Sequence, residues 1–99
     1  MKHEDITDEL VEAILALTTS VRMAEGLKPE LVSRVENALN VAAEQWRGQA
    51  MIPKRAANVL AELAPWVEGA SYLYNGEESE RIREYSIHLG ELVLKCLAV

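Results

Sequence analysis

Apolar residues recur at spacings of three and four along most of the chain, which is the pattern of amphipathic helices. The clearest stripe lies in segment 53–75 and keeps its phase through an internal proline, Pro65. Its members are Ala56, Val59, Leu60, Leu63, Ala64, Val67, Ala70 and Tyr74. Pro65 falls on the opposite side of the helix, so the Ala61 carbonyl would lose its hydrogen bond on the water-facing side. We therefore predict one helix from Pro53 to Asn75, kinked at Pro65.

A first helix precedes this segment at the N-terminal end of the chain. Asp5 or Thr7 is expected to be its N-cap residue, because short polar side chains there accept hydrogen bonds from the free N–H groups of the first turn. The helix is expected to end at Ala24 or Glu25. Gly26 would then follow as the C′ residue in the left-handed conformation.

Prolines and glycines mark the limits of the remaining helices. Pro29 suits the first turn of a second helix, which is expected to end near Gly48. Asn75 and Gly76 suit the positive φ angles of a turn, and three glutamates then begin a last helix. Each helix has about 20 residues and the connections are short, which favours antiparallel neighbours. The sequence thus predicts an all-α single domain over residues 1–99, an up-down-up-down four-helix bundle.

Charge and composition narrow the functional classes. The net charge is −6, with six acidic residues against two basic ones in residues 1–25. This balance disfavours direct binding to the phosphate backbone of nucleic acids. No apolar run approaches the roughly 20 residues of a membrane-spanning helix, and the N-terminus does not have the pattern of a secretory signal. The single cysteine, Cys96, excludes an internal disulfide, so we expect a cytoplasmic protein.

Glu84, His88 and Glu91 form the group most typical of a metal or catalytic site, because their spacing places them on one helical face. Metal centres in helical bundles, however, use inward-pointing ligands from several helices. Here the histidine faces outward, and Arg81 and Lys95 flank the group. We interpret it as a solvated ladder of ion pairs and predict no metal and no cofactor.

The segment Arg83-Glu-Tyr-Ser-Ile-His88 resembles the arginine, four residues, histidine motif of the HEPN-type ribonucleases, which are dimeric four-helix bundles. The resemblance covers six residues and implies catalytic roles for Arg83 and His88. The family usually has Asn, Asp or His after the arginine, where this chain has Glu84. On a regular helix the pair would lie about 140° apart, so it could converge only across a dimer or at a frayed helix end. A ribonuclease or a degenerate relative is therefore an alternative reading.

Surplus apolar residues indicate self-association. Ile87 and Leu94 lie roughly 130° from the apolar stripe of the last helix, and Val11 and Leu15 widen the stripe of the first. Because the first and last helices of an up-and-down bundle are neighbours, we expect these four residues to form one homodimer interface. The function predicted is protein–protein interaction and self-association without catalysis.

Two further binding surfaces are possible from the sequence. Trp66, Tyr72 and Leu73 flank the apolar stripe of segment 53–75, or point away from it, and predict an exposed patch for a ligand or partner. The acidic first and last helices fit an inhibitor or antitoxin-like protein that binds a basic partner.

Overall fold

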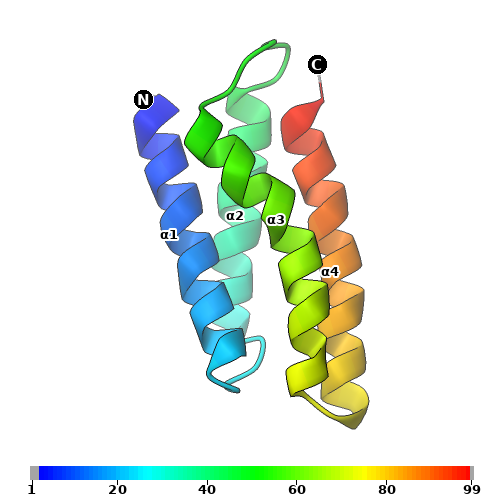
Figure 1. The fold of residues 1–99 in the computed structure, drawn as a ribbon. Coiled ribbons are helices and arrows are strands. Elements are labelled where there is room, and N and C mark those ends of the chain that lie inside the picture. Colours follow the sequence, from blue (N-terminus) through cyan, green and yellow to red (C-terminus); the bar gives the residue numbers. More distant parts are fainter. Residues whose placement is uncertain (1–2, 99) are drawn as a thin grey trace.

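The computed structural model describes residues 3–98, which form four α-helices and one 3₁₀ turn. The elements are α1 His3–Arg22, α2 Pro29–Gln45, α3 Lys54–Ala70, the 3₁₀ turn η1 Ser71–Leu73 and α4 Gly76–Leu97. Successive helices run in opposite directions (Figure 1), which confirms the all-α, up-down-up-down bundle. Within the described residues there is no strand, and no helix is long and apolar enough to cross a membrane.

The order of the helices around the bundle differs from the expected one. α1 and α4 each pack against both α2 and α3, so α1 lies diagonally across from α4. Ion pairs join α1 to its neighbours: Arg34 of α2 contacts Glu9 at 2.9 Å and Arg55 of α3 contacts Asp8 at 2.7 Å. The expectation that the first and last helices are neighbours is therefore wrong. Residues 46–53, which can extend up to about 25 Å, connect the diagonal pair α2 and α3 over one end.

The apolar stripes of the sequence are the buried faces of the helices. α1 contributes Ile6, Leu10, Ala13, Ile14, Leu17 and Val21; α2 contributes Val35, Ala38, Leu39 and Ala42; α3 contributes Ala56, Leu60, Leu63, Val67 and Ala70; α4 contributes Ile82, Leu89, Leu92, Val93 and Cys96. Trp46, which follows α2, is also fully buried. Each buried Leu or Val side chain contributes on the order of 2 kcal/mol. One core shared by all four helices therefore holds the bundle together.

The start of α1 corrects the expectation about its N-cap residue. The helix begins at His3, so Asp5 and Thr7 lie inside it and neither is its N-cap residue. The Thr7 side chain is buried, and its hydroxyl has no hydrogen-bond partner among the side chains and backbone groups that the structure describes. The preference of Asp5 and Thr7 for the N-cap position therefore did not set the start of the helix.

The end of α1 shows the hydrogen bonds of a Schellman motif. The Glu25 N–H donates to the Ser20 carbonyl at 2.9 Å, and the Ala24 N–H donates to the Val21 carbonyl at 3.1 Å. Ala24 therefore occupies the C′ position, with a φ of 64° that is unusual for a residue other than glycine. Gly26 also has a positive φ, 81°, as expected, but it lies two residues beyond C′.

The hydroxyl of Tyr74, between η1 and α4, connects this turn to a segment distant in the sequence. The Gly26 N–H donates to Tyr74 Oη at 2.9 Å, and Tyr74 Oη donates to the Val21 carbonyl at 2.7 Å. Ser20 Oγ donates to the Gly26 carbonyl at 3.1 Å. Both backbone groups of the buried Gly26 are thus satisfied by side chains, and the α1–α2 turn is tied to the segment that precedes α4.

α3 is one continuous helix with Pro65 inside it, rather than two helices. Pro53 immediately precedes it, with the extended backbone expected at a helix start. The α-helix ends at Ala70, earlier than the expected Asn75, and the 3₁₀ turn η1 continues the chain to Leu73. Pro65 is exposed to solvent, on the side that the sequence indicated. The kink at Pro65 stays a prediction.

Candidate functional site

Arg83 and His88, the pair suggested by the ribonuclease-like motif, point to different partners. Arg83 Nη1 lies 2.8 Å from Glu80 Oε1 on the same helix. His88 Nε2 lies 3.4 Å from Glu36 Oε2 of α2, and its Nδ1 lies 3.9 Å from Glu91 Oε1. The two side chains therefore form no common site within one chain.

The Glu84, His88 and Glu91 group is likewise divided by the fold. In the part of the chain that the structure describes, no three His, Cys, Asp or Glu side chains gather in an arrangement that could hold a metal ion. His88 reaches across to α2, whereas Glu84 borders a groove at the start of α4. Glu36 was missed because periodicity along one helix does not identify a partner on another helix.

Two potential nucleophiles or bases are held in their protonated forms. Burial raises the pKa of the Cys96 thiol to about 11, and Cys96 Sγ lies 3.2 Å from the Leu39 carbonyl as its hydrogen-bond donor. Burial, together with the Glu36 carboxylate, raises the pKa of Tyr85 well above its ordinary value. A protonated thiol is a poor nucleophile, and a protonated phenol is no base, so neither group is prepared for catalysis near neutral pH.

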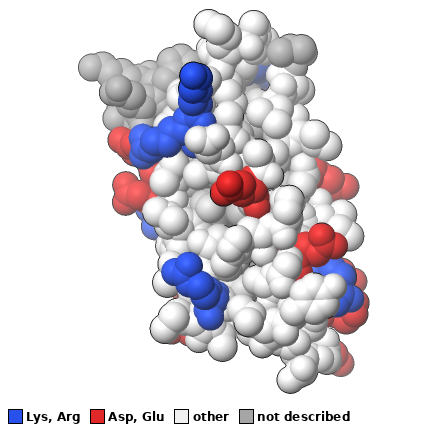
Figure 2. Space-filling model, in the orientation of Figure 1, with Lys and Arg blue, Asp and Glu red and all other residues white. Residues whose placement is uncertain are grey.

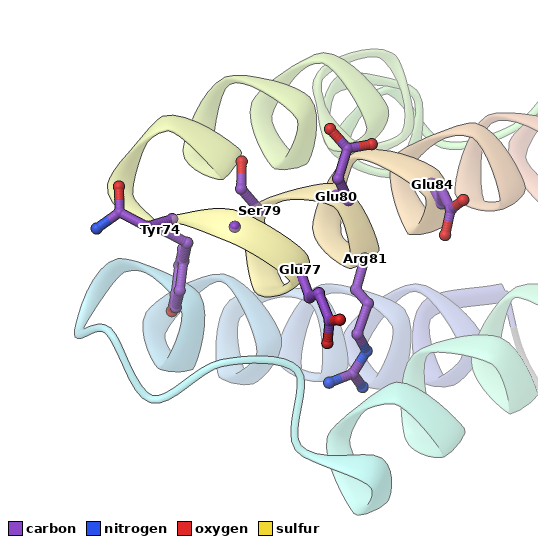
Figure 3. A pocket seen from close by; sticks show the side chains of 8 residues that line it. Tyr74, Glu77, Ser79, Glu80, Arg81 and Glu84 are labelled. Atoms are coloured by element: carbon purple, nitrogen blue, oxygen red, sulfur yellow. The ribbon is translucent and has the colours of Figure 1, made fainter.

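An open groove of about 700 Å³ lies at the start of α4 (Figure 3). It is lined by Tyr74, Asn75, Gly76, Glu77, Ser79, Glu80, Arg81 and Glu84. Figure 3 shows Ser79 and Glu80 pointing to one side of α4, while Glu77 and Arg81 point to the other. Because these side chains diverge, the groove offers an acidic surface and no convergent catalytic group.

A smaller hollow of about 370 Å³ adjoins this groove and shares Arg81 and Glu84 with it. Leu27, Pro29 and Val32 give it an apolar wall from the α1–α2 connection and α2. Arg81 is already paired with Glu78 of its own helix, with Nη1 3.0 Å from Oε1. The cation in this region is therefore partly neutralised, and the surface around the start of α4 stays acidic.

The predicted interface residues of α1 border α3. Leu15 is 57% exposed and Val11 is half-buried. We call the hollow beside Leu15 the α1–α3 groove; it has a volume of about 220 Å³. Its lining residues are Ile14, Leu15, Thr18 and Arg22 of α1 with Val59, Glu62, Leu63 and Trp66 of α3.

The predicted interface residues of α4 border α3 on its other flank. A Cβ atom built on Gly90 would lie 3.8 Å from the Cβ of Ala64, so Gly90 faces α3. Ile87 and Leu94 lie three residues before and four residues after Gly90, on the same side of α4. They are 65% and 68% exposed. We call this pair the α4 ridge.

The four predicted interface residues thus lie on both sides of α3 rather than next to one another. Between the α1–α3 groove and the α4 ridge, the exposed residues of α3 include Ala61 and Pro65. Figure 2 views the molecule from the side on which α3 lies in front, and shows a mostly white face with an acidic group near its centre and basic groups above and below it. We call this surface, from the α1–α3 groove to the α4 ridge, the α3 face.

The predicted aromatic patch is distributed over two places. Trp66 is half-buried in the α1–α3 groove and therefore belongs to the α3 face. Tyr72, 83% exposed, and Leu73 lie in the 3₁₀ turn η1 after α3. None of the hollows described above brings these three side chains together.

No known protein family, no curated protein and no solved structure matches this chain. Function must therefore be argued from the geometry of its own surfaces.

Proposed function

We propose that the protein is a small interaction module that self-associates through the α3 face and has no catalytic role. The observation that carries this proposal is the exposure of the large apolar side chains Leu15, Ile87 and Leu94 on both flanks of α3. A soluble monomer rarely exposes a contiguous apolar surface of several hundred Å². A two-fold dimer is the commonest way to cover such a surface.

The dimensions and charges of the molecule support this choice. Its extents are 41 by 20 by 19 Å, so one long side offers about 800 Å², which is what each partner buries in an interface of standard size. With a net charge of −6, two copies repel each other over long distances. The α3 face carries charges of both signs, Arg22 and Glu62 in its groove and Arg83 on its α4 flank, so it adds little to this repulsion.

The test is sedimentation equilibrium of the wild type, Leu15→Glu and Leu94→Glu. A two-fold interface contains each new carboxylate twice, and burying an unpaired charge costs several kcal/mol. We expect a wild-type dimer at tens of micromolar and monomeric variants that stay folded by circular dichroism. Val41→Glu is the matched control, because Val41 is 47% exposed on α2, the helix diagonal to α3; it should remain dimeric. A monomeric wild type, or folded Glu variants that still dimerise, contradicts the proposal.

A second candidate function is binding of a basic protein, and the acidic groove at the start of α4 favours it. Glu77, Glu80 and Glu84 line this groove around a single arginine. The expected partner surface is rich in Lys and Arg, and binding should weaken steeply with salt. Titration with a lysine- and arginine-rich peptide tests this. The double variant Glu80→Gln with Glu84→Gln should weaken binding, whereas the control Glu44→Gln should leave it unchanged. If the double variant binds as tightly as the wild type, the groove is not the binding site.

A further inference from the structure

We propose that the second copy docks with its α4 ridge against the α1–α3 groove of the first, around a two-fold axis that runs along α3. In this arrangement Ile87 of each copy enters the groove beside Leu15 and Val59 of the other. The inference rests on the proposed self-association and specifies its geometry.

The shape of the α3 face is the first reason. One flank is concave, since the α1–α3 groove has a volume of about 220 Å³ and an apolar floor that includes Val59 and Leu63. The other flank is convex, because Ile87 and Leu94 project with about two thirds of their surface exposed. Well-packed interfaces match projections to hollows.

Only one of the two possible two-fold axes matches these shapes. An axis along α3 places α1 of each copy opposite α4 of the other, so that Ile87 of each ridge meets a groove. An axis across α3 places α1 on α1 and α4 on α4, so that ridge meets ridge and groove meets groove. The second arrangement leaves both hollows unfilled, and unfilled hollows forfeit packing contacts.

An axis along α3 also requires that ridge and groove lie at similar heights in the bundle. α1 ends and α4 begins at the same end of the molecule (Figure 1). At 1.5 Å per residue, Leu15 lies about 10 Å and Ile87 about 16 Å from the respective helix ends. Val59, in the same groove, lies about 16 Å from the end of α3. Ile87 therefore faces the part of the groove between Leu15 and Val59.

One pair of charges on the two flanks is complementary, Glu62 and Arg83; the groove is also lined by Arg22, and Arg83 already contacts Glu80 of its own helix. Glu62 is the carboxylate that lines the α1–α3 groove. Arg83 lies one turn before Ile87 on the same side of α4. Glu62 and Arg83 lie about 12 Å and 10 Å from the same end of the bundle. The proposed axis thus brings Arg83 of each copy near Glu62 of the other, whereas an axis across α3 would not.

The experiment mixes two charged variants, Leu15→Glu and Ile87→Lys, each expected to weaken self-association at least ~10-fold alone. In a mixed dimer around the proposed axis, one contact joins the new glutamate to the new lysine and the other is the unchanged Leu15–Ile87 contact. We therefore expect an equimolar mixture to regain the dimer in sedimentation equilibrium. The matched control mixes Leu15→Glu with Leu15→Lys, which should regain the dimer only if α1 packs on α1.

Cross-linking provides a second readout that does not depend on charge. Under mild oxidation, chains with Leu15→Cys should form disulfides with chains carrying Ile87→Cys, and neither should cross-link with itself. The native Cys96 is buried and does not interfere. A dimeric wild type without rescue or mixed cross-links overturns this docking alone. A wild type that is monomeric at tens of micromolar overturns the docking and the proposed function together.

Discussion

The hydroxyl of Tyr74 provides the sharpest test of the contact between the α1–α2 turn and the segment that precedes α4. Tyr74→Phe removes the oxygen that accepts from the Gly26 N–H and donates to the Val21 carbonyl, at 2.9 Å and 2.7 Å. The ring itself is retained, so the substitution creates no large cavity. Any loss of stability therefore reports the two hydrogen bonds.

The expected loss of stability is the sum of what the Gly26 N–H and the Val21 carbonyl each lose when the hydroxyl is removed. Gly26 is buried, so its N–H loses its acceptor without gaining full access to water, at a cost of about 1–3 kcal/mol. The Val21 carbonyl still accepts from the Ala24 N–H at 3.1 Å, so its loss is smaller, about 0.5–1 kcal/mol. The total is about 1.5–4 kcal/mol, which corresponds to a Tm about 6–30 °C lower for a domain of this size.

The assay is urea unfolding followed by circular dichroism, at one fixed protein concentration because self-association adds to apparent stability. Tyr72→Phe is the matched control. Tyr72 is 83% exposed, and its hydroxyl should contribute less than about 0.5 kcal/mol. If the free energies of unfolding of Tyr74→Phe and Tyr72→Phe differ by less than about 0.5 kcal/mol, the two hydrogen bonds of the Tyr74 hydroxyl do not stabilise the turn.

Four further substitutions test other parts of the fold by the same urea unfolding. Ala24→Gly should raise the free energy of unfolding by about 1 kcal/mol, because glycine adopts the left-handed φ of 64° without strain. Gly26→Ala should lower the free energy of unfolding by about 1–2 kcal/mol, since the φ of Gly26 is 81° and an added Cβ would lie 3.1 Å from a carboxylate oxygen of α4. If Ala24→Gly and Gly26→Ala change the stability in the same direction, this description of the turn is wrong. Thr7→Val should be neutral or stabilise by up to about 1 kcal/mol, because it removes a buried hydroxyl without a partner; a clear loss would reveal a hidden partner. Pro65→Ala should be tolerated or stabilise, because it restores a donor on the exposed side of α3, whereas a loss above about 2 kcal/mol would mean that the proline fixes a required bend.

The helices and their buried faces were predictable because each is encoded locally. Apolar spacing identified the buried side of every helix, and Pro29 marked the start of α2 correctly. The ends were less predictable. Ala24 took the left-handed position that glycine usually fills, because the two hydrogen bonds of the Schellman motif and the Tyr74 contact fix the turn. That contact joins residues 53 positions apart, and no local pattern contains it.

The neighbours of each helix were not predictable in the same way. Antiparallel order follows from short connections, but a connection that can extend about 25 Å reaches a diagonal position as readily as an adjacent one. Exposure at Leu15, Ile87 and Leu94 followed from helical phase. Their placement around α3, and the contact between His88 and Glu36, follow only from the packing.

The proposed dimer also bears on the ribonuclease alternative. That alternative needs Arg83 and His88 to converge across two chains, since within one chain Arg83 pairs with Glu80 and His88 with Glu36. Arg83 shares the α3-facing side of α4 with Ile87, so a dimer through the α3 face brings both copies of Arg83 to the interface. His88 faces α2, which is diagonal to α3, and stays outside that interface. If Leu94→Glu disrupts the dimer, the interface is the α3 face, and Arg83 and His88 then lie apart. A ribonuclease site would instead require a dimer through the α2–α4 side.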